Sequence, residues 1–281
     1  MKDIICLCKL KVSFFAALSA AAGFILASGK INVMTLLIFF SVFTLACGAS
    51  ALNQYQERAT DALMERTRNR PVPSGRMVPG KALVIVAPLI LSGLMSLYVA
   101  FGLTTLLLGL CALLLYNGIY TGMKAKSAFA AAPGALIGAI PPAIGWAAAG
   151  GPLSDPRLLS VSLFFVIWQI PHFWLFLLRY GVEYENAGLP SITLLMGRKQ
   201  IERVVFHWLS VTALCGPLLC LFGLGRSAVV QYSLIAASAW LVIRGIGFVR
   251  NGAAASPVFR SLDKYVLLVV ALLVSDRILM P

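Results

Sequence analysis

The chain alternates between long runs of hydrophobic residues and shorter polar segments. Each hydrophobic run has about twenty residues, which is the length that an α-helix needs to cross a bilayer. Nine membrane-spanning helices are predicted, at about residues 10–28, 33–52, 82–100, 103–121, 129–149, 158–178, 205–223, 228–247 and 262–280. Because backbone groups in lipid must be hydrogen-bonded within a helix or a closed barrel, the expected fold class is an all-α, polytopic membrane protein.

The basic residues are unevenly divided between the two sides of these predicted helices. If the N-terminus and every second connection share one side, that side carries all but four of the 23 Lys and Arg residues, the exceptions being Lys30, Arg157, Arg226 and Arg277. The positive-inside rule makes the richer side cytoplasmic. We therefore expect a multi-pass protein of the cell inner membrane with a cytoplasmic N-terminus, in contact with membrane lipid.

The composition supports the same interpretation. Hydrophobic residues make up 60% of the chain and charged residues only 12%, about half the charged share of a typical soluble domain. The net charge of +13 is then a sign of topology; no soluble basic face is predicted, so nucleic acid is not an expected partner. No change in composition divides the sequence, and residues 1–281 are predicted to form a single membrane domain.

A polar motif follows the second hydrophobic run. Asn53, Glu57 and Asp61 are spaced four residues apart, so they share one face of a helix. Carboxylate and amide oxygens are suitable ligands for Mg²⁺, and arginines such as Arg66 and Arg70 bind phosphate oxygens in pairs. The motif therefore predicts a Mg²⁺–diphosphate site with these five catalytic residues, three of them metal ligands. A solvated amphipathic helix with internal ion pairs is the alternative.

Three residues with polar atoms lie within the sixth hydrophobic run. Trp168, Gln169 and His172 stand in a segment that is otherwise apolar, and polar side chains inside a span usually mark a functional site. His172 can bind a metal centre, hydrogen-bond a carboxylate or move a proton near neutral pH. The other interpretation is that His172 only bridges two helices. We predict that all three bind substrate.

Two further charged residues are candidates on the cytoplasmic side. Lys124 ends the fourth run and can reach the predicted diphosphate. It fits equally well a lysine that only sets the orientation of the protein in the membrane. The connection at 179–204 is expected to be a second acidic loop, in which Glu183 is the chosen metal ligand. Within the fifth predicted span, Pro141-Pro142 is expected to kink the helix.

Several segments resemble a known family. The first motif and its continuation resemble the UbiA-type intramembrane prenyltransferases. Other segments are similar to the protoheme IX farnesyltransferases, also called haem O synthases, within that superfamily. The matching segments are Met64-Glu65-Arg66-Thr67, Asn69-Arg70-Pro71, Pro73-Ser74-Gly75, Ile140 to Trp146, Trp168-Gln169, Pro171 to Trp174, and Tyr184 with Ala187 to Pro190. The similarity runs from about residue 9 to residue 192. Glu57 departs from it, since the family usually has Asp there.

The resemblance implies a specific reaction. Farnesyl diphosphate would ionise at the cytoplasmic edge with Mg²⁺ as cofactor, and its allylic cation would alkylate a vinyl group of haem b, giving haem O after addition of water. Glu183 and Tyr184 would belong to the substrate site, and haem A synthase or terminal oxidase assembly factors are possible downstream partners. The alternatives are a UbiA-type enzyme that prenylates a quinone precursor or another lipid-like acceptor, and a non-catalytic paralogue that binds haem or an isoprenoid.

Overall fold

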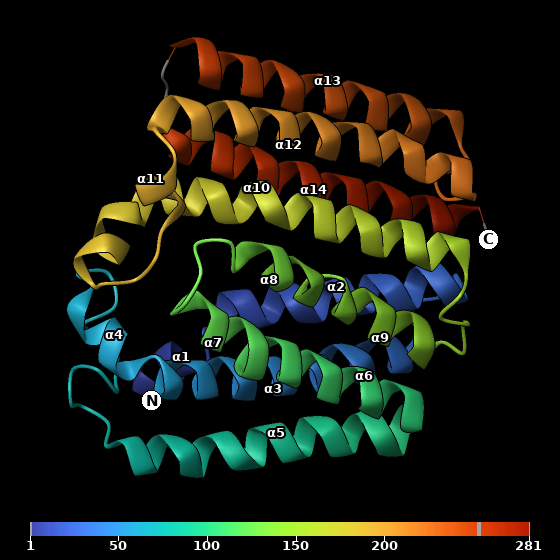
Figure 1. Ribbon diagram of the computed structural model, residues 1–281. Coiled ribbons are helices and arrows are strands. Elements are labelled where there is room, and N and C mark those ends of the chain that lie inside the picture. Colours follow the sequence, from blue (N-terminus) through green and yellow to red (C-terminus); the bar gives the residue numbers. More distant parts are fainter. Residues whose placement is uncertain (1, 252–253, 281) are drawn as a thin grey trace.

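The structure is a computed structural model that describes residues 2–251 and 254–280, and it is a bundle of helices (Figure 1). No strand occurs in these described ranges. The helices in chain order are α1 (Lys2–Leu7), α2 (Leu10–Ser28), α3 (Val33–Gln56), α4 (Arg58–Leu63), α5 (Pro79–Phe101), α6 (Leu103–Leu113), the π-helix η1 (Leu114–Tyr120), α7 (Thr121–Lys124), α8 (Ala131–Ile137), α9 (Ile140–Ala148), α10 (Pro156–Asn186), α11 (Ile192–Leu195), α12 (Arg198–Leu218), the 3-10 helix η2 (Leu219–Phe222), α13 (Ala228–Asn251) and α14 (Ala255–Leu279).

Eight helical segments among the described residues are long and apolar enough to cross a membrane. They coincide with the first eight predicted spans, and the all-α, polytopic fold class is confirmed. The ninth predicted span falls in α14, which has 25 residues. Charged residues are spread along α14, with Arg260, Asp263 and Lys264 in its first half and Asp276 and Arg277 near its end, so no stretch of about twenty residues in it is free of charge. The count of nine spans therefore stays a prediction.

The sixth span is longer than predicted. We expected a loop from residue 179, but α10 continues to Asn186, so Glu183 lies on a helix and not in a loop. Gly188 follows with a φ of 70°, in the left-handed region, which ends the helix. The prediction was wrong because hydropathy reports where a helix leaves lipid, whereas this helix keeps its backbone hydrogen bonds beyond that point.

The predicted kink in the fifth span is confirmed. Helices α8 and α9 are separated at Gly138 and Ala139, directly before Pro141-Pro142. A proline has no N–H to donate to the preceding turn, and its ring crowds that turn. Gly145 of α9 faces the backbone of Ala20 on α2, where a Cβ atom would clash. The broken span therefore packs closely against α2.

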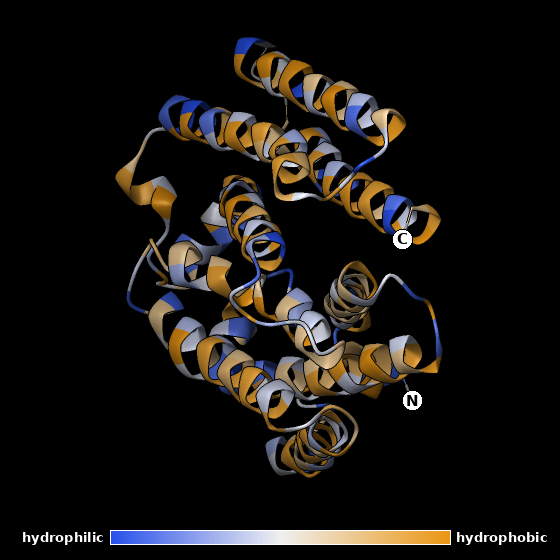
Figure 2. Cartoon of the chain, turned by 90° about the vertical axis from the view of Figure 1, so that its right-hand side faces the viewer, coloured by the Kyte–Doolittle hydropathy of each residue, from blue (hydrophilic) through white to orange (hydrophobic). Residues whose placement is uncertain are grey.

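The bundle has two halves (Figure 1). In one half, α10, α12, α13 and α14 share a large hydrophobic cluster that includes Phe164 and Tyr265. In the other, α2, α3, α5 and α9 share a second cluster that includes Ile38 and Ile144. Hydrophobic residues cover most of the long helices (Figure 2). The described chain begins at one end of the bundle and finishes at the other (Figure 1).

Candidate active site

A cavity of about 650 Å³ lies between the two halves of the bundle. Side chains from α2, α3, η1, α8, α9, α10 and α14 line it. The predicted site residues in its wall are Asn53, Glu57, Arg66, Arg70, Lys124, Trp168, Gln169, His172 and Tyr184. Asp61 and Glu183 are not among the residues that line it. The cavity thus brings together most of two sequence motifs, one ending at Arg70 and the other beginning at Trp168.

The cavity also reaches the hydrophobic outer surface of the bundle. Val12 and Phe15 of α2 and Leu267 of α14 line it, and each of these side chains is exposed. All three lie on helices of the predicted membrane region. This exposed apolar wall is suited to contact with an apolar molecule.

Glu57 and Lys124 form an ion pair at the polar end of the cavity. Glu57 lies at the junction of α3 and α4, and Lys124 ends α7. The Lys124 ammonium donates to Oε1 of Glu57 at 3.0 Å. Burial alone would raise the pKa of the Glu57 carboxyl, but the neighbouring ammonium groups of Lys124 and Lys9 outweigh it and hold this pKa below its usual value. Glu57 is therefore kept as a carboxylate.

Lys9 is a site residue that the sequence analysis missed. It stands between α1 and α2 with a φ of 44°, an uncommon backbone conformation for a residue with a side chain. Its ammonium donates to Oδ1 of Asn53 at 2.6 Å, and Asn53 in turn donates to Thr121 at 3.0 Å. Burial, followed by the charge of Arg70, lowers the pKa of Lys9 to about 7. No pattern in the sequence indicates this role, because a lysine directly before a span is also expected from the positive-inside rule.

Asp61 does not point into the cavity as the spacing predicted. Asp61 is almost fully buried, and Arg70 donates to its Oδ2 atom at 2.6 Å. The helical hydrogen bonds continue from Asn53 through Glu57 to Asp61, so the shared helix face is present. The chain then turns back after Met64 and brings the guanidinium of Arg70 against Asp61. Arg70 is thereby held at the cavity wall.

Arg66 connects the first motif to α10. Its guanidinium lies over the rings of Phe176 and Tyr180, 5.0 and 5.1 Å from their centroids. Its backbone N–H donates to Oε2 of Glu183 at 2.9 Å. Glu183, which we expected to bind metal, therefore lies beside the Arg66 backbone and fixes the position of the arginine.

The polar end of the cavity carries more positive than negative charge. Lys9, Arg66, Arg70 and Lys124 all line it; Glu57 and Asp61 form ion pairs with the side chains of Lys124 and Arg70, and Glu183 meets the backbone of Arg66. Buried charges in proteins are normally paired. This end of the cavity is therefore suited to a polyvalent anion, and phosphate groups match the geometry of arginine and lysine donors.

The residues at the polar end of the cavity fit a Mg²⁺ ion only if the bound anion also coordinates that ion. In the described parts of the chain, no three His, Cys, Asp or Glu side chains are close enough to hold a metal. Magnesium is usually bound by one or two carboxylates together with substrate phosphates, and not by an all-protein cage. Glu57 supplies a carboxylate in the cavity wall, and Asn53 supplies an amide oxygen beside it. This donor set fits Mg²⁺ bound together with a diphosphate.

A second polar group lines another part of the cavity. His172 of α10 and Asp263 of α14 both line it, with Nδ1 of the imidazole 3.0 Å from Oδ1 of the carboxylate. The imidazole also lies against Phe259, at 4.5 Å between ring centroids, and Trp168, at 5.1 Å. Gln169 packs against Gly138, where a Cβ atom would leave it no room. Asp263 was not predicted as a site residue.

The two polar groups are separated along α10. His172 and Tyr184 are twelve residues apart in this helix, which corresponds to roughly 18 Å along its axis. Tyr184 lies at the polar end, where the ammonium of Lys124 sits 5.3 Å from its ring centroid. The wall between the two groups is largely aromatic and apolar, and Tyr120 lies against Phe173 there at 5.7 Å.

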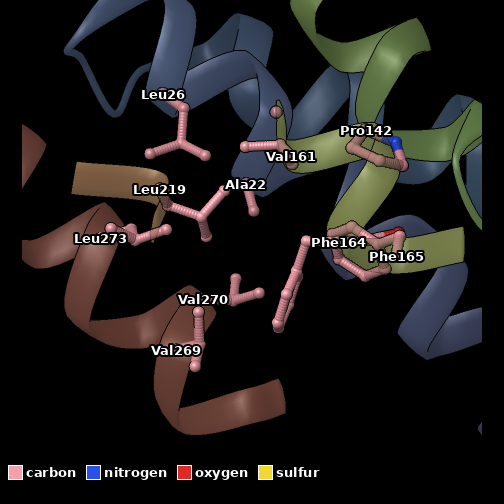
Figure 3. Close-up of a pocket in the computed structure, with 12 residues that line it drawn as sticks. Ala22, Leu26, Pro142, Val161, Phe164, Phe165, Leu219, Val269, Val270 and Leu273 are labelled. Carbon is pink, nitrogen blue, oxygen red and sulfur yellow. The ribbon is translucent and has the colours of Figure 1, made fainter. Parts of the chain in front are cut away.

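A much smaller space of about 10 Å³ lies where α2, α9, α10 and α14 meet (Figure 3). Apolar side chains, including Leu26, Phe164 and Leu273, surround it (Figure 3). It is too small and too apolar to hold an ordered water molecule. We interpret it as a packing defect of the core, and the chemistry as belonging to the larger cavity.

Comparison with known proteins defines the class. The sequence pattern of the UbiA prenyltransferase family matches residues 15–263. A protoheme IX farnesyltransferase of Nitratidesulfovibrio vulgaris is 38% identical over 218 residues, covering 76% of each chain. One of Geobacter sulfurreducens is 40% identical over 214 residues, covering 76% of this chain and 79% of the relative.

Solved structures share the fold at low sequence identity. A structure described as digeranylgeranylglyceryl phosphate synthase in membranes superposes with a TM-score of 0.79, at 16% identity and 99% coverage of both chains. A UbiA homologue from Archaeoglobus fulgidus bound to GPP and Mg²⁺ gives a TM-score of 0.70, at 13% identity, with 99% of this chain and 100% of that chain covered.

The helical membrane bundle and its cationic cavity thus define an intramembrane prenyltransferase. The chain belongs to the UbiA prenyltransferase family, and its relatives at 38% and 40% identity bear the name protoheme IX farnesyltransferase.

Proposed function

We propose that this prenyltransferase transfers the farnesyl group of farnesyl diphosphate to a vinyl group of haem b, giving haem O. The observation that carries the proposal is the cavity itself, which joins a cluster of four cationic side chains to a histidine–aspartate pair farther along α10. The cationic end suits a diphosphate, and an imidazole suits the iron of a porphyrin. The names of the relatives support haem as the acceptor.

The diphosphate would lie at the cationic end. Lys9, Lys124 and Arg66 offer donors to its oxygens from three different elements, and Arg70 adds a guanidinium held by Asp61. Mg²⁺, shared between the diphosphate and the oxygens of Asn53 and Glu57, would neutralise charge as the diphosphate departs. A related UbiA homologue binds GPP and Mg²⁺, which supports both ligands.

The chemistry follows from this placement. The bond between C1 of the farnesyl group and the bridging oxygen breaks, and its electron pair leaves with the diphosphate. Positive side chains at the cavity end stabilise the charge that develops there. The terminal vinyl carbon bonds to C1, and the resulting cation next to the porphyrin takes up water and loses a proton. The aromatic wall around Tyr120 and Phe173 excludes water from the allylic cation before that step.

The setting of the reaction is also proposed. We place the protein in the cell inner membrane with a cytoplasmic N-terminus and treat residues 1–281 as one catalytic domain. The diphosphate would then enter from the cytoplasmic side, where the basic residues gather, and the apolar substrates from lipid past Val12 and Phe15. Haem A synthase or terminal oxidase assembly factors would receive the product.

The test is a reconstituted reaction. Purified protein in lipid nanodiscs receives farnesyl diphosphate, Mg²⁺ and haem b, and the extracted porphyrins are separated by chromatography and identified by mass spectrometry. The proposal predicts a haem that carries one farnesyl group and one added hydroxyl. Haem b recovered unchanged, while the same preparation prenylates an aromatic quinone precursor, would assign the chain to the alternative acceptor class.

A further inference from the structure

The contact between His172 and Asp263 has a consequence beyond the proposed reaction. An aspartate carboxylate accepts hydrogen bonds and does not donate them, so the proton of the neutral imidazole belongs on Nδ1, where the 3.0 Å contact is made. The other ring nitrogen, Nε2, then carries the lone pair. A carboxylate that fixes the tautomer of a histidine in this way also makes it a better metal ligand.

The position of the carboxylate is determined by the rest of α14. Tyr265, two residues after Asp263, is completely buried in the core. Its hydroxyl donates to the backbone oxygen of Ala213 at 2.9 Å and lies 3.0 Å from Ser238. Helix α14 is thus tied to α12 and α13, while Asp263 lines the cavity and meets His172 on α10.

Aromatic rings limit how the imidazole can turn. Phe259, one turn before Asp263 on α14, lies 4.5 Å from the imidazole centroid, and Trp168 and Phe173 lie on its own helix at 5.1 and 6.2 Å. None of the three rings offers a second acceptor for the Nδ1 proton: Phe259 and Phe173 have no polar atom, and the indole N–H of Trp168, which has no partner in the described structure, can only donate. The rings also provide a surface against which a flat macrocycle can stack.

We infer that Asp263 is a positioning residue, which holds His172 so that Nε2 binds the central metal of a metalloporphyrin acceptor. The inference rests on the proposed function, because it requires haem to enter this cavity. It assigns a role to a residue of the last helix, outside the motifs that identified the site. It also predicts that recognition of the acceptor depends on its metal and not only on its ring.

The experiment is a binding titration of the full-length protein in nanodiscs with three ligands: haem b, metal-free protoporphyrin IX and farnesyl diphosphate. Four proteins are compared: wild type, Asp263→Asn, His172→Ala and the control Asp3→Asn, which changes an exposed carboxylate on α1. The Soret band reports ligation of the haem iron.

The inference predicts that Asp263→Asn weakens haem binding by about 10- to 100-fold, the usual effect of losing a carboxylate behind a ligating histidine, and shifts the Soret band. Binding of metal-free protoporphyrin and of farnesyl diphosphate stays at the wild-type value. His172→Ala abolishes the Soret shift altogether, and Asp3→Asn changes none of the three affinities.

Two contrary results are distinguishable. If wild type binds haem with a Soret shift that Asp263→Asn leaves unchanged, or if Asp263→Asn weakens all three ligands alike, Asp263 is only structural and the inference fails while the proposed function stands. If wild type binds neither porphyrin, the proposed function fails.

Discussion

The ammonium nitrogen of Lys9 lies 2.6 Å from Oδ1 of Asn53, and this contact joins the segment before the first span to the end of α3. It brings a cation from the start of the chain into the wall of the cavity, next to the predicted diphosphate position. Lys11, only two residues later, is exposed. The pair of lysines therefore offers a matched comparison of a cation inside the site with one outside it.

Replacing Lys9 with Met is expected to weaken binding of farnesyl diphosphate by about 10- to 100-fold, because a hydrogen bond to a charged group contributes about 1.5–3 kcal/mol. Lys11→Met should leave the affinity at the wild-type value. Isothermal titration with farnesyl diphosphate in the presence of Mg²⁺ measures both. Equal affinities for the two variants would remove Lys9 from the diphosphate site.

The Glu57–Lys124 ion pair leads to a second prediction. Glu57→Gln removes the negative charge and leaves Lys124 without its partner, so turnover should fall by at least about tenfold, the rate equivalent of 1.36 kcal/mol. Glu57→Asp keeps the charge, and the flexible Lys124 side chain can follow the shorter carboxylate, so most activity should remain. Rates of prenyl transfer distinguish the two. An inactive Glu57→Asp protein would show that reach, and not charge, is what the site requires.

Asp61 is predicted to act through Arg70. Asp61→Ala removes one partner of a buried ion pair, which typically costs about 3–5 kcal/mol of stability, so the variant should unfold at a lower temperature as well as lose turnover. The exposed Glu65 pairs with the exposed Arg68, at 3.7 Å, and Glu65→Ala should leave stability unchanged. Thermal unfolding in detergent measures the difference. An Asp61→Ala protein with wild-type stability and no activity would contradict this role and favour direct metal binding.

The predicted orientation can be tested by labelling. In a protein whose native cysteines are replaced, single cysteines at the exposed positions Ser74 and Asn186 should react with an impermeant maleimide only from the cytoplasmic side. A cysteine at Ser154, also exposed, should react only from the opposite side. Reaction of Ser154→Cys and Ser74→Cys from the same side would overturn the predicted topology.

Much of the fold could be predicted from the sequence, because lipid imposes a simple rule on every residue of a span. A run of about twenty apolar residues must be helical there, and eight of the predicted spans match helices of the structure. The continuation of α10 to Asn186 could not be predicted in this way, since hydropathy does not distinguish a loop from a helix that extends into water. In the ninth predicted span, the charged residues of α14 interrupt the apolar run, so hydropathy alone does not decide whether this helix crosses the membrane.

The candidate site was predicted less completely, for a different reason. Residues of one motif, such as Asn53 and Glu57, share a helix face and could be found from their spacing. Lys9 and Asp263 contact their partners across 44 and 91 residues of sequence, and no local pattern encodes such contacts. The pairing of Asp61 with Arg70 depends on how the chain turns after α4, which the spacing of the carboxylates does not specify.

The central claim is that haem is the acceptor, and a competition assay tests it most directly. The protein in nanodiscs receives farnesyl diphosphate and Mg²⁺ with equal concentrations of haem b and 4-hydroxybenzoate, an aromatic quinone precursor. Mass spectrometry then identifies which acceptor carries the farnesyl group. We predict that hydroxyfarnesylated haem is the dominant product and that His172→Ala lowers its yield. Farnesylated 4-hydroxybenzoate as the main product, with haem b unchanged, would contradict the claim.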